Sequence, residues 1–157
     1  MAVDKINKDV LEYLSNLLEA RLASAGKKPV KDTDGNTKYE DASIFTPEEI
    51  KSFLLLSLSA FNSYPPITYF SLANEEFCKT FAALIVSYAA AKALASKALT
   101  EKGREYSISS SGISYQPTPL SDMLWAQSVE ENRYWYDHIF ETKKSHDFQD
   151  NWATKDE

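Results

Sequence analysis

The chain of 157 residues carries 43% apolar and 13% aromatic side chains, enough to build the core of one domain, which excludes wholesale disorder. Its 17 basic and 23 acidic side chains give a net charge of −6, and no long cluster of Lys and Arg favours tight binding to a nucleic-acid backbone. The single cysteine, Cys78, has no partner for an intramolecular disulfide, so we expect a small buried apolar side chain and a reducing, intracellular site of assembly.

No segment is expected to cross a membrane. The longest apolar run, residues 81–95, is interrupted by Ser87 and Lys92 and is shorter than the roughly 20 residues that a bilayer requires. The first residues place charged side chains around isolated apolar ones, unlike the apolar core of a signal peptide. The composition therefore predicts a soluble protein that is not secreted by that route.

An amphipathic helix is expected near the N-terminus, over residues 10–25. Apolar side chains recur there at intervals of three and four residues, and Gly26 follows the last of them. The next segment, residues 27–43, is rich in Pro, Asp, Gly and Asn, which favour turns. We interpret it as a long loop.

The second expected helix, from Pro47 to about Asn62, has the best-specified ends in the chain. Thr46 is suited to cap its first turn, and proline is favoured at the first helical position. The prolines that follow Tyr64 end the helix because proline cannot donate the next hydrogen bond. Its apolar residues occupy more than one face, so the helix should be mostly buried.

A long third helix is expected from Glu75 to Lys102, with Asn74 as its cap and Gly103 at its end. At about 1.5 Å per residue it spans roughly 42 Å. Its many alanines keep its surface small, so neighbouring helices can pack closely against it. The pattern predicts the central helix of a bundle.

After Gly103 the pattern changes to alternation, which is typical of strands. Together with a Ser-Ser-Gly bend, it predicts a β-hairpin over residues 105–116 with four apolar side chains on one face. These side chains are Tyr106, Ile108, Ile113 and Tyr115. An isolated hairpin is marginally stable in water, so the bundle or a neighbouring subunit should cover this face.

A last helix should begin at Thr118–Pro119 and run to about Lys144, with apolar residues on two faces. The remaining residues, 145–157, are polar and acidic, and we expect a tail that is flexible in isolation. The predicted fold class is thus mainly α: one helical domain over residues 1–144, built on a long central helix, with a β-hairpin inserted before the C-terminal helix.

The sequence pattern most similar to a metal-binding site is an acidic turn. If Gly35 takes the sixth position of an EF-hand loop, Asp32, Asp34 and Asp41 fall at the third, fifth and twelfth positions, but Val30 stands where the first carboxylate belongs. An ordinary polar turn is the stronger interpretation, with calcium as the alternative. No other metal site and no cofactor are expected.

Catalysis is not expected either. His138 and His146 are the only histidines, and neither has further ligands at a spacing that indicates a zinc site. We expect His138 on a helix surface or at an interface. No nucleophile elbow, P-loop or dinucleotide fingerprint is present. An unrecognised hydrolase that depends on His138 stays open, since a catalytic triad converges only in the fold.

The terminal helix has more apolar surface than one small domain can bury, so part of it should contact another protein. The candidate functional residues are accordingly interface residues. They are Tyr106, Ile108, Ile113, Tyr115, Trp125, Tyr136, Phe140, Phe148 and Trp152.

Three stretches, residues 95–108, 112–117 and 120–124, resemble proteins encoded among the virion genes of tailed bacteriophages. They read ASKALTEKGREYSI, GISYQP and LSDML. The helix from Leu14 to Leu22 and the Pro65-Pro66 region are similar too, so the resemblance covers most of the chain. It includes no catalytic signature.

The architecture also resembles head-to-tail connector adaptors, small helical neck proteins. This resemblance implies a ring, commonly of twelve copies, that contacts the portal protein and a tail or second neck protein. DNA would pass through its channel without specific binding, in a virion assembled in the host cytoplasm, with no membrane. The segment 27–43 departs from the adaptors, whose N-terminal region is shorter.

Three alternatives remain open from the sequence. The chain could be another virion protein, such as a tail terminator or a capsid-associated protein. It could be a small helical domain whose aromatic cluster binds a ligand or a peptide, or the hydrolase considered above. The binding domain should be a monomer or dimer with a defined pocket, whereas the connector should form a high-order assembly.

Overall fold

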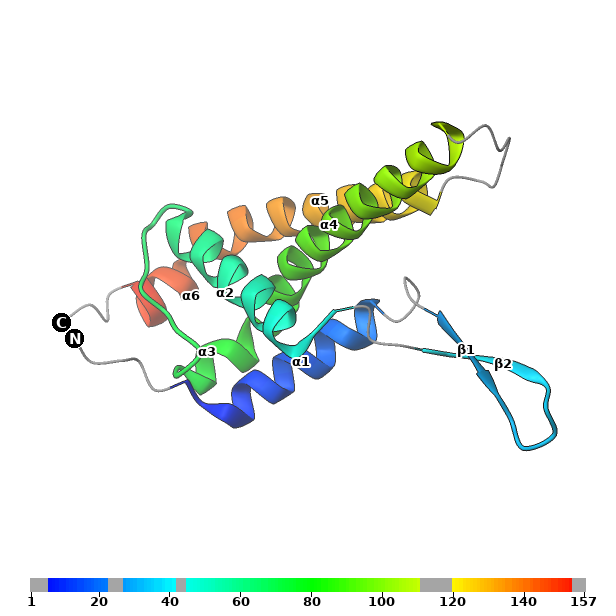
Figure 1. The fold of residues 1–157 in the computed structure, drawn as a ribbon. Coiled ribbons are helices and arrows are strands. Elements are labelled where there is room, and N and C mark those ends of the chain that lie inside the picture. The colour runs from blue at the N-terminus through cyan, green and yellow to red at the C-terminus, as the bar shows by residue number, and fades with distance from the viewer. Residues whose placement is uncertain (1–5, 23–26, 42–44, 111–119, 154–157) are drawn as a thin grey trace.

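The computed structural model describes residues 6–22, 27–41, 45–110 and 120–153, which form a helical bundle with a projecting two-stranded arm (Figure 1). The elements are α1 (Lys8–Leu22), β1 (Lys27–Lys31), β2 (Thr37–Asp41), α2 (Pro47–Ser63), α3 (Glu75–Thr80), α4 (Ala82–Ser110), α5 (Leu120–Lys144), α6 (His146–Phe148) and the π-helix η2 (Gln149–Ala153). The predicted mainly α class is confirmed.

The central position expected for the long helix is confirmed. The helix α4 contacts α1, α2, α3 and α5, and it runs alongside α5 in Figure 1. Ala89, Ala90 and Ala93 are fully buried. Serine hydroxyl groups of two neighbouring helices donate hydrogen bonds to backbone carbonyls of α4. The Ser57 hydroxyl of α2 donates to the Ile85 carbonyl at 2.6 Å, and Ser128 of α5 donates to the Ala91 carbonyl at 2.8 Å.

The N-terminal part of this helix differs from the prediction in two respects. Phe81 leaves helical geometry, with φ −106° and ψ 22°, and so divides α3 from α4. Its ring packs against Phe61, Phe77 and Phe148, and this packing outweighs the helical preference of one residue. Asn74 makes no side-chain capping bond; its Oδ1 instead accepts from the Ser71 N–H at 2.8 Å.

The expected β-hairpin over residues 105–116 is wrong for residues 105–110, because α4 continues through Gly103 to Ser110. A glycine inside a helix costs only about 1 kcal/mol relative to alanine, so it does not stop a long helix that is already formed. Residues 111–116 lie outside the described residues.

Strands occur instead where a long loop was expected. β1 and β2 form an antiparallel pair over residues 27–41, in which Pro29 stands opposite Tyr39. Gly35, at φ 79°, takes the left-handed conformation that closes the hairpin. The turn-forming residues between the strands were recognised, but the strands on either side were too short and too charged to be identified.

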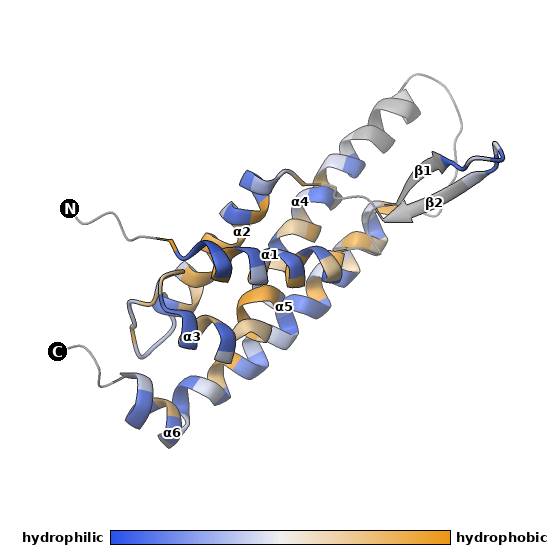
Figure 2. Ribbon diagram, turned by 90° about the horizontal axis from the view of Figure 1, so that it is seen from below, coloured by the Kyte–Doolittle hydropathy of each residue, from blue (hydrophilic) through white to orange (hydrophobic). Residues whose placement is uncertain are grey.

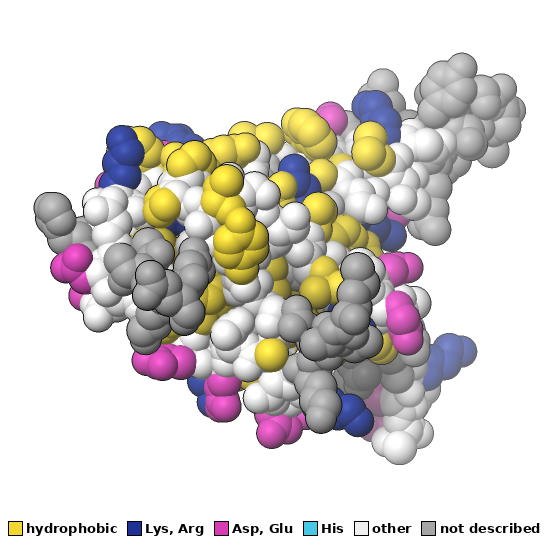
Figure 3. Space-filling model, turned by 90° about the vertical axis from the view of Figure 1, so that its left-hand side faces the viewer, with side chains coloured by type: hydrophobic (Ala, Val, Ile, Leu, Met, Phe, Trp, Pro, Cys, Tyr) yellow, Lys and Arg dark blue, Asp and Glu magenta, His cyan; other side chains and the backbone are white. Residues whose placement is uncertain are grey.

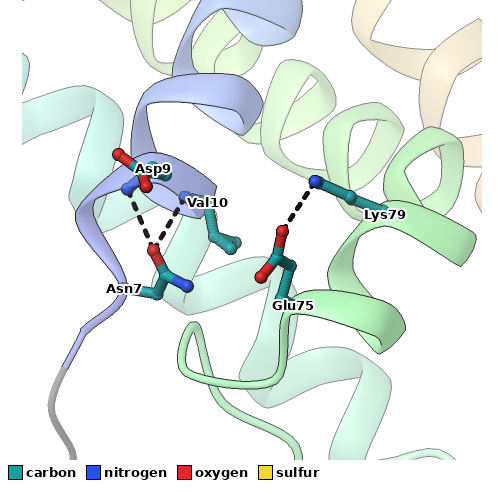
Figure 4. A network of polar contacts seen from close by, with 5 residues as sticks. All are labelled: Asn7, Asp9, Val10, Glu75 and Lys79. Atoms are coloured by element: carbon teal, nitrogen blue, oxygen red, sulfur yellow. Dashed lines mark hydrogen bonds and ion pairs between the residues drawn. The ribbon is translucent and has the colours of Figure 1, made fainter.

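The start of α2 predicted from capping chemistry is accurate. Thr46 accepts from the Glu49 N–H at 3.2 Å, and α2 begins at Pro47. Asn7 Oδ1 accepts from the N–H groups of Asp9 and Val10 at the start of α1, which Figure 4 shows beside the α3 ion pair between Glu75 and Lys79. Figure 2 shows hydrophilic and hydrophobic residues alternating along α1, as in an amphipathic helix.

The expectation of a flexible tail is wrong for residues 145–153, which continue in α6 and η2. Phe148 is 2% exposed and packs against Phe61 and Phe81. Trp152 makes edge-on contacts with Phe70, Phe77 and Phe81. Two large aromatic side chains in a short polar segment outweigh its hydrophilic composition. Residues 154–157 lie outside the described residues.

Within the described residues, Ala82–Gly103 is long and apolar enough to cross a membrane by length and composition. The share of its most apolar window that is buried inside the bundle is 61%. The core helix of a soluble bundle has the same composition, so the apolar character of α4 is explained without a bilayer.

Candidate functional site

A row of half-exposed apolar side chains runs along α5. Trp125, Val129, Tyr136 and Phe140 are 53%, 49%, 53% and 47% exposed. Their spacings of four, seven and four residues place them on one side of the helix. The adjacent face, with Leu124, Ser128, Trp135 and Ile139, is buried. We call these four exposed side chains the α5 row.

The α5 row extends onto α4 at its Trp125 end. Leu99 of α4 is 70% exposed and, together with Trp125, lines a shallow pocket of about 270 Å³ between the two helices. Lys102 and Asp122 complete the rim of this pocket. The result is an apolar surface with polar edges, as in many protein–protein interfaces.

A second apolar surface lies on the α2–α3 loop, residues 64–74. Ile67 and Tyr69 are 62% and 79% exposed, whereas Thr68 between them is buried and Phe70 is half-buried. Figure 3 shows the face of the molecule on which this loop lies in Figure 1. Apolar side chains form a band across the upper part of this face, and acidic side chains lie along its lower edge.

Asn62, near the end of α2, fixes the conformation of this loop. Its Nδ2 donates to the Phe70 carbonyl at 2.9 Å, and its Oδ1 accepts from the Thr68 hydroxyl at 2.9 Å and the Phe70 N–H at 3.1 Å. The Asn62 carbonyl accepts from the Thr68 N–H at 3.0 Å. The loop therefore presents Ile67 and Tyr69 from a preorganised backbone, which lowers the entropy cost of binding.

Lys143 of α5 connects this loop to the end of α2. Its side chain is fully buried, and Nζ donates to the carbonyls of Phe61 and Tyr64, to the Pro66 carbonyl at 2.9 Å and toward the Thr68 hydroxyl at 3.4 Å. A cation suits the carbonyl end of a helix. Every donor direction of the ammonium is thus used inside the protein, which makes Lys143 a structural residue and not an accessible nucleophile.

Burial lowers the pKa of Lys143 from its ordinary 10.5 to about 8. An unfolded lysine keeps its proton up to about pH 10.5, so between these two values the unfolded state binds more protons than the folded state. Raising the pH through this window therefore favours the folded state.

This linkage gives a prediction for the pH dependence of stability. The free energy of unfolding of the wild type exceeds that of Lys143→Met, and this difference should be about 2 kcal/mol larger at pH 9.5 than at pH 7. Urea unfolding measures it. Lys144→Met, at the exposed neighbouring position, is the control and should show no such change. Parallel pH profiles for the wild type and Lys143→Met would contradict the lowered pKa.

A pocket of about 590 Å³ lies between α2 and the α2–α3 loop. Its lining includes Ile6, Leu55, Leu58, Ile67 and Tyr69. The volume is within the range of small-molecule sites. Its apolar lining and exposed rim suit an apolar group or a side chain of another protein.

The structure places the predicted interface residues in different surroundings. Trp125, Tyr136 and Phe140 are exposed on one helix face, as an interface requires. Phe148 lies in the core, so its assignment to an interface is corrected; Trp152 is half-buried against the core aromatics.

The four residues assigned to the hairpin face contribute no described surface. Tyr106 and Ile108 belong to α4, and their side chains lie outside the described part of the structure. Ile113 and Tyr115 lie outside the described residues altogether.

Sequence reasoning missed Ile67, Tyr69 and Leu99, the three most exposed large apolar side chains of the described residues. The alternation of Ile67, Thr68, Tyr69 and Phe70 after Pro65-Pro66 was a usable signal, because two of the four residues must face outward in an extended segment. Leu99 carried no signal of its own within an apolar helix.

The residues considered for catalysis or metal binding have structural roles. Cys78 is buried, and burial raises the pKa of its thiol to about 11, which makes it unreactive. His138 is exposed on α5 and stacks on Tyr134. Asp32 Oδ1 accepts from the N–H groups of Asp34 and Asn36, as in an ordinary polar turn.

The calcium alternative is not supported by the described residues. In the strand register Asp41 stands opposite Lys27 at the base of the hairpin, whereas Asp32 and Asp34 lie at its tip, so the three residues lie at opposite ends of the arm. Within the described ranges no group of three His, Cys, Asp or Glu side chains is placed to hold a metal ion.

Comparisons with known proteins give no match to a family model, a curated protein or a solved structure. The resemblance to virion proteins therefore stays a prediction, and the exposed surfaces are the physical basis for a function.

Proposed function

We propose that this chain is a structural component of a tailed-phage virion, a connector of the head-to-tail type that assembles into a ring by contacts between copies. The observation that carries this proposal is the α5 row, in which four large apolar side chains remain about half exposed. Apolar side chains that remain exposed along one side of a helix favour association because contact removes them from water. No residue is required to act as a catalyst.

The positions of the α2–α3 loop and of the Leu99–Trp125 end of the α5 row suit a ring. The α2–α3 loop contacts Lys143 near the end of α5, while Leu99 and Trp125 lie near its start. Lys143 follows Trp125 by 18 positions, which corresponds to about 27 Å of helix. Head-to-tail contacts between different surfaces at opposite ends of a subunit generate closed rings when the rotation between subunits closes.

Charge and the resemblance add support for this role. The net charge of −6 suits a protein beside which DNA passes without sticking. The segments that resemble virion proteins, residues 95–108 and 120–124, include Leu99 and adjoin Trp125, so the resemblance falls on the same region as the exposed surface. The portal and a tail or second neck protein are the proposed neighbours.

Removing apolar groups from the α5 row tests the proposal. The double variant Trp125→Ser/Tyr136→Ser should weaken self-association at least 10-fold, because central aromatic side chains contribute most of the energy of an interface. Light scattering after size exclusion measures the change. Met123→Ser is the matched control, because Met123 is equally exposed at 53% but lies on another side of α5. Equal masses for the double variant and the control would contradict a role for the row.

The pocket beside the α2–α3 loop favours a second candidate, a small domain that binds an apolar ligand or a peptide. This candidate predicts a monomer or dimer that binds a hydrophobic probe such as anilinonaphthalene sulfonate. Binding should be lost in Leu55→Glu, which places a charge in the pocket lining. A high-order assembly whose probe binding is unaffected by Leu55→Glu would favour the connector.

A further inference from the structure

The β arm, residues 27–41, extends from the bundle into solvent (Figure 1). A two-stranded hairpin by itself is marginally stable in water. Among the described residues no further strand pairs with it, so each of its strands has an outer edge at which another strand can pair. We therefore expect the arm to be stabilised when a strand of another chain pairs with one of its edges.

Hydrogen bonds at the tip establish which backbone groups face outward. The Asp32 N–H donates to the Asn36 carbonyl at 3.0 Å, and the Gly35 N–H donates to the Asp32 carbonyl at 3.1 Å, the arrangement of a hairpin with a glycine bulge. Hydrogen-bonded and non-hydrogen-bonded pairs alternate in an antiparallel ladder. Counting from Asp32 and Asn36, the pair Pro29–Tyr39 is non-hydrogen-bonded, so its backbone groups face the two outer edges.

The two edges are not equivalent. On β1 the central outward position is Pro29, which has no N–H, so this edge cannot donate to a new strand there. On β2 the outward positions are Thr37, Tyr39 and Asp41, each of which has both a donor and an acceptor. The edge of β2 is thus the one open to an added strand.

The sequence of β2 is complementary to itself when a second copy runs antiparallel to it. With Tyr39 opposite the Tyr39 of a second copy, Lys38 stands opposite Glu40 on both sides of the two-fold axis, and Thr37 stands opposite Asp41. Centring the pairing on Lys38 or on Glu40 would place like charges opposite each other. The Tyr39 register also matches the outward-facing backbone groups, so charge and hydrogen bonding select the same alignment.

We propose that the β arms of two copies of this chain pair through β2 across a two-fold axis, forming a four-stranded antiparallel sheet. The interface is isologous, since the same edge serves both partners. This inference does not rest on the virion function or on the α5 row, because it needs only two copies of the chain.

Cysteine cross-linking tests the pairing directly. In the proposed register the two Tyr39 Cα atoms lie about 5.5 Å apart, which is within disulfide reach. Under mild oxidation Tyr39→Cys should form a covalent dimer of twice 17.7 kDa on a non-reducing gel. Lys31→Cys, on the outer strand, should stay monomeric on the gel, and the buried Cys78 should not compete. Absence of the Tyr39→Cys dimer, or equal cross-linking of both variants, would overturn the proposal.

Charge exchange supplies a second, independent test. Lys38→Glu alone should weaken arm pairing at least 10-fold. The double variant Lys28→Glu/Glu40→Lys should weaken it by as much, while the exchanged charges at the Lys28–Glu40 pair stay opposite in sign within the arm. With Trp125→Ser/Tyr136→Ser added to both variants, so that the α5 row does not associate, mixing them should restore a one-to-one heterodimer, measured by sedimentation at low salt. Each variant dimerising as the wild type does, or the mixture failing to associate, would overturn the pairing. Unchanged melting temperatures confirm that the bundle is intact.

Discussion

Replacing Phe148 with alanine is expected to lower the free energy of unfolding by about 3 to 5 kcal/mol, the cost of deleting a large aromatic side chain from a packed core. The Phe148 ring lies 6.1 Å from that of Phe61 and 5.8 Å from that of Phe81, measured between centroids. Phe148 is 2% exposed, so the whole side chain contributes to the core. Urea denaturation followed by circular dichroism measures the change.

Phe140→Ala is the matched control, because Phe140 is 47% exposed on the α5 row. Its loss should change stability by about 1 kcal/mol or less. Similar losses for the two variants would contradict the assignment of Phe148 to the core. The same reasoning means that a chain ending at Lys144 would lose stability as well as any contact made by residues 145–157.

The second large effect is expected at Lys143. Lys143→Met keeps a similar length but removes the donors that satisfy the carbonyls of Phe61, Tyr64 and Pro66. Leaving buried acceptors without partners should lower the free energy of unfolding by about 3 kcal/mol at pH 7 and the melting temperature by roughly 6 to 12 °C. Differential scanning calorimetry measures both quantities.

The control for this prediction is Lys144→Met, whose side chain lies at the surface over the Phe140 ring. Its melting temperature should stay within about 2 °C of the wild type. A Lys143→Met protein as stable as the control at pH 7 would show that the buried ammonium does not hold the end of α2 to the α2–α3 loop.

The helical part of the fold could be predicted from the sequence where capping chemistry is local. Thr46 and Pro47 define the start of α2, and the prolines after Tyr64 define its end, because these effects depend on a few adjacent residues. The central role of α4 followed from its alanines. The α5 row was anticipated because Trp125, Tyr136 and Phe140 share a spacing that one helix face requires.

The strands were misplaced because alternation over a few residues is a weak signal. The alternation after Gly103 competes with a helix already formed from Ala82, and adding residues to an existing helix is favourable. In the β arm, Asp32, Gly35 and Asn36 were recognised as turn residues, but the paired strands carry mainly charged side chains and no apolar alternation. Turn chemistry alone does not show whether a ladder continues on both sides.

The structure of the α2–α3 loop could not be predicted because it depends on contacts between distant residues. Lys143 lies 77 residues from Pro66, to whose carbonyl it donates. A lysine near the end of a helix is ordinarily assigned to solvent. Phe148 and Trp152 were assigned to an interface for a similar reason, since a polar segment gives no indication that two of its side chains reach the core.

The central claim is that the exposed apolar surface of α5 is used for association between copies. The most direct test is the molar mass of Lys38→Glu, in which pairing through the β arm is weakened, measured by light scattering over a range of concentrations. The account predicts assemblies several times heavier than 17.7 kDa, which dissociate when Trp125→Ser/Tyr136→Ser is added. A mass of 17.7 kDa at every concentration, with the α5 row intact, would contradict it.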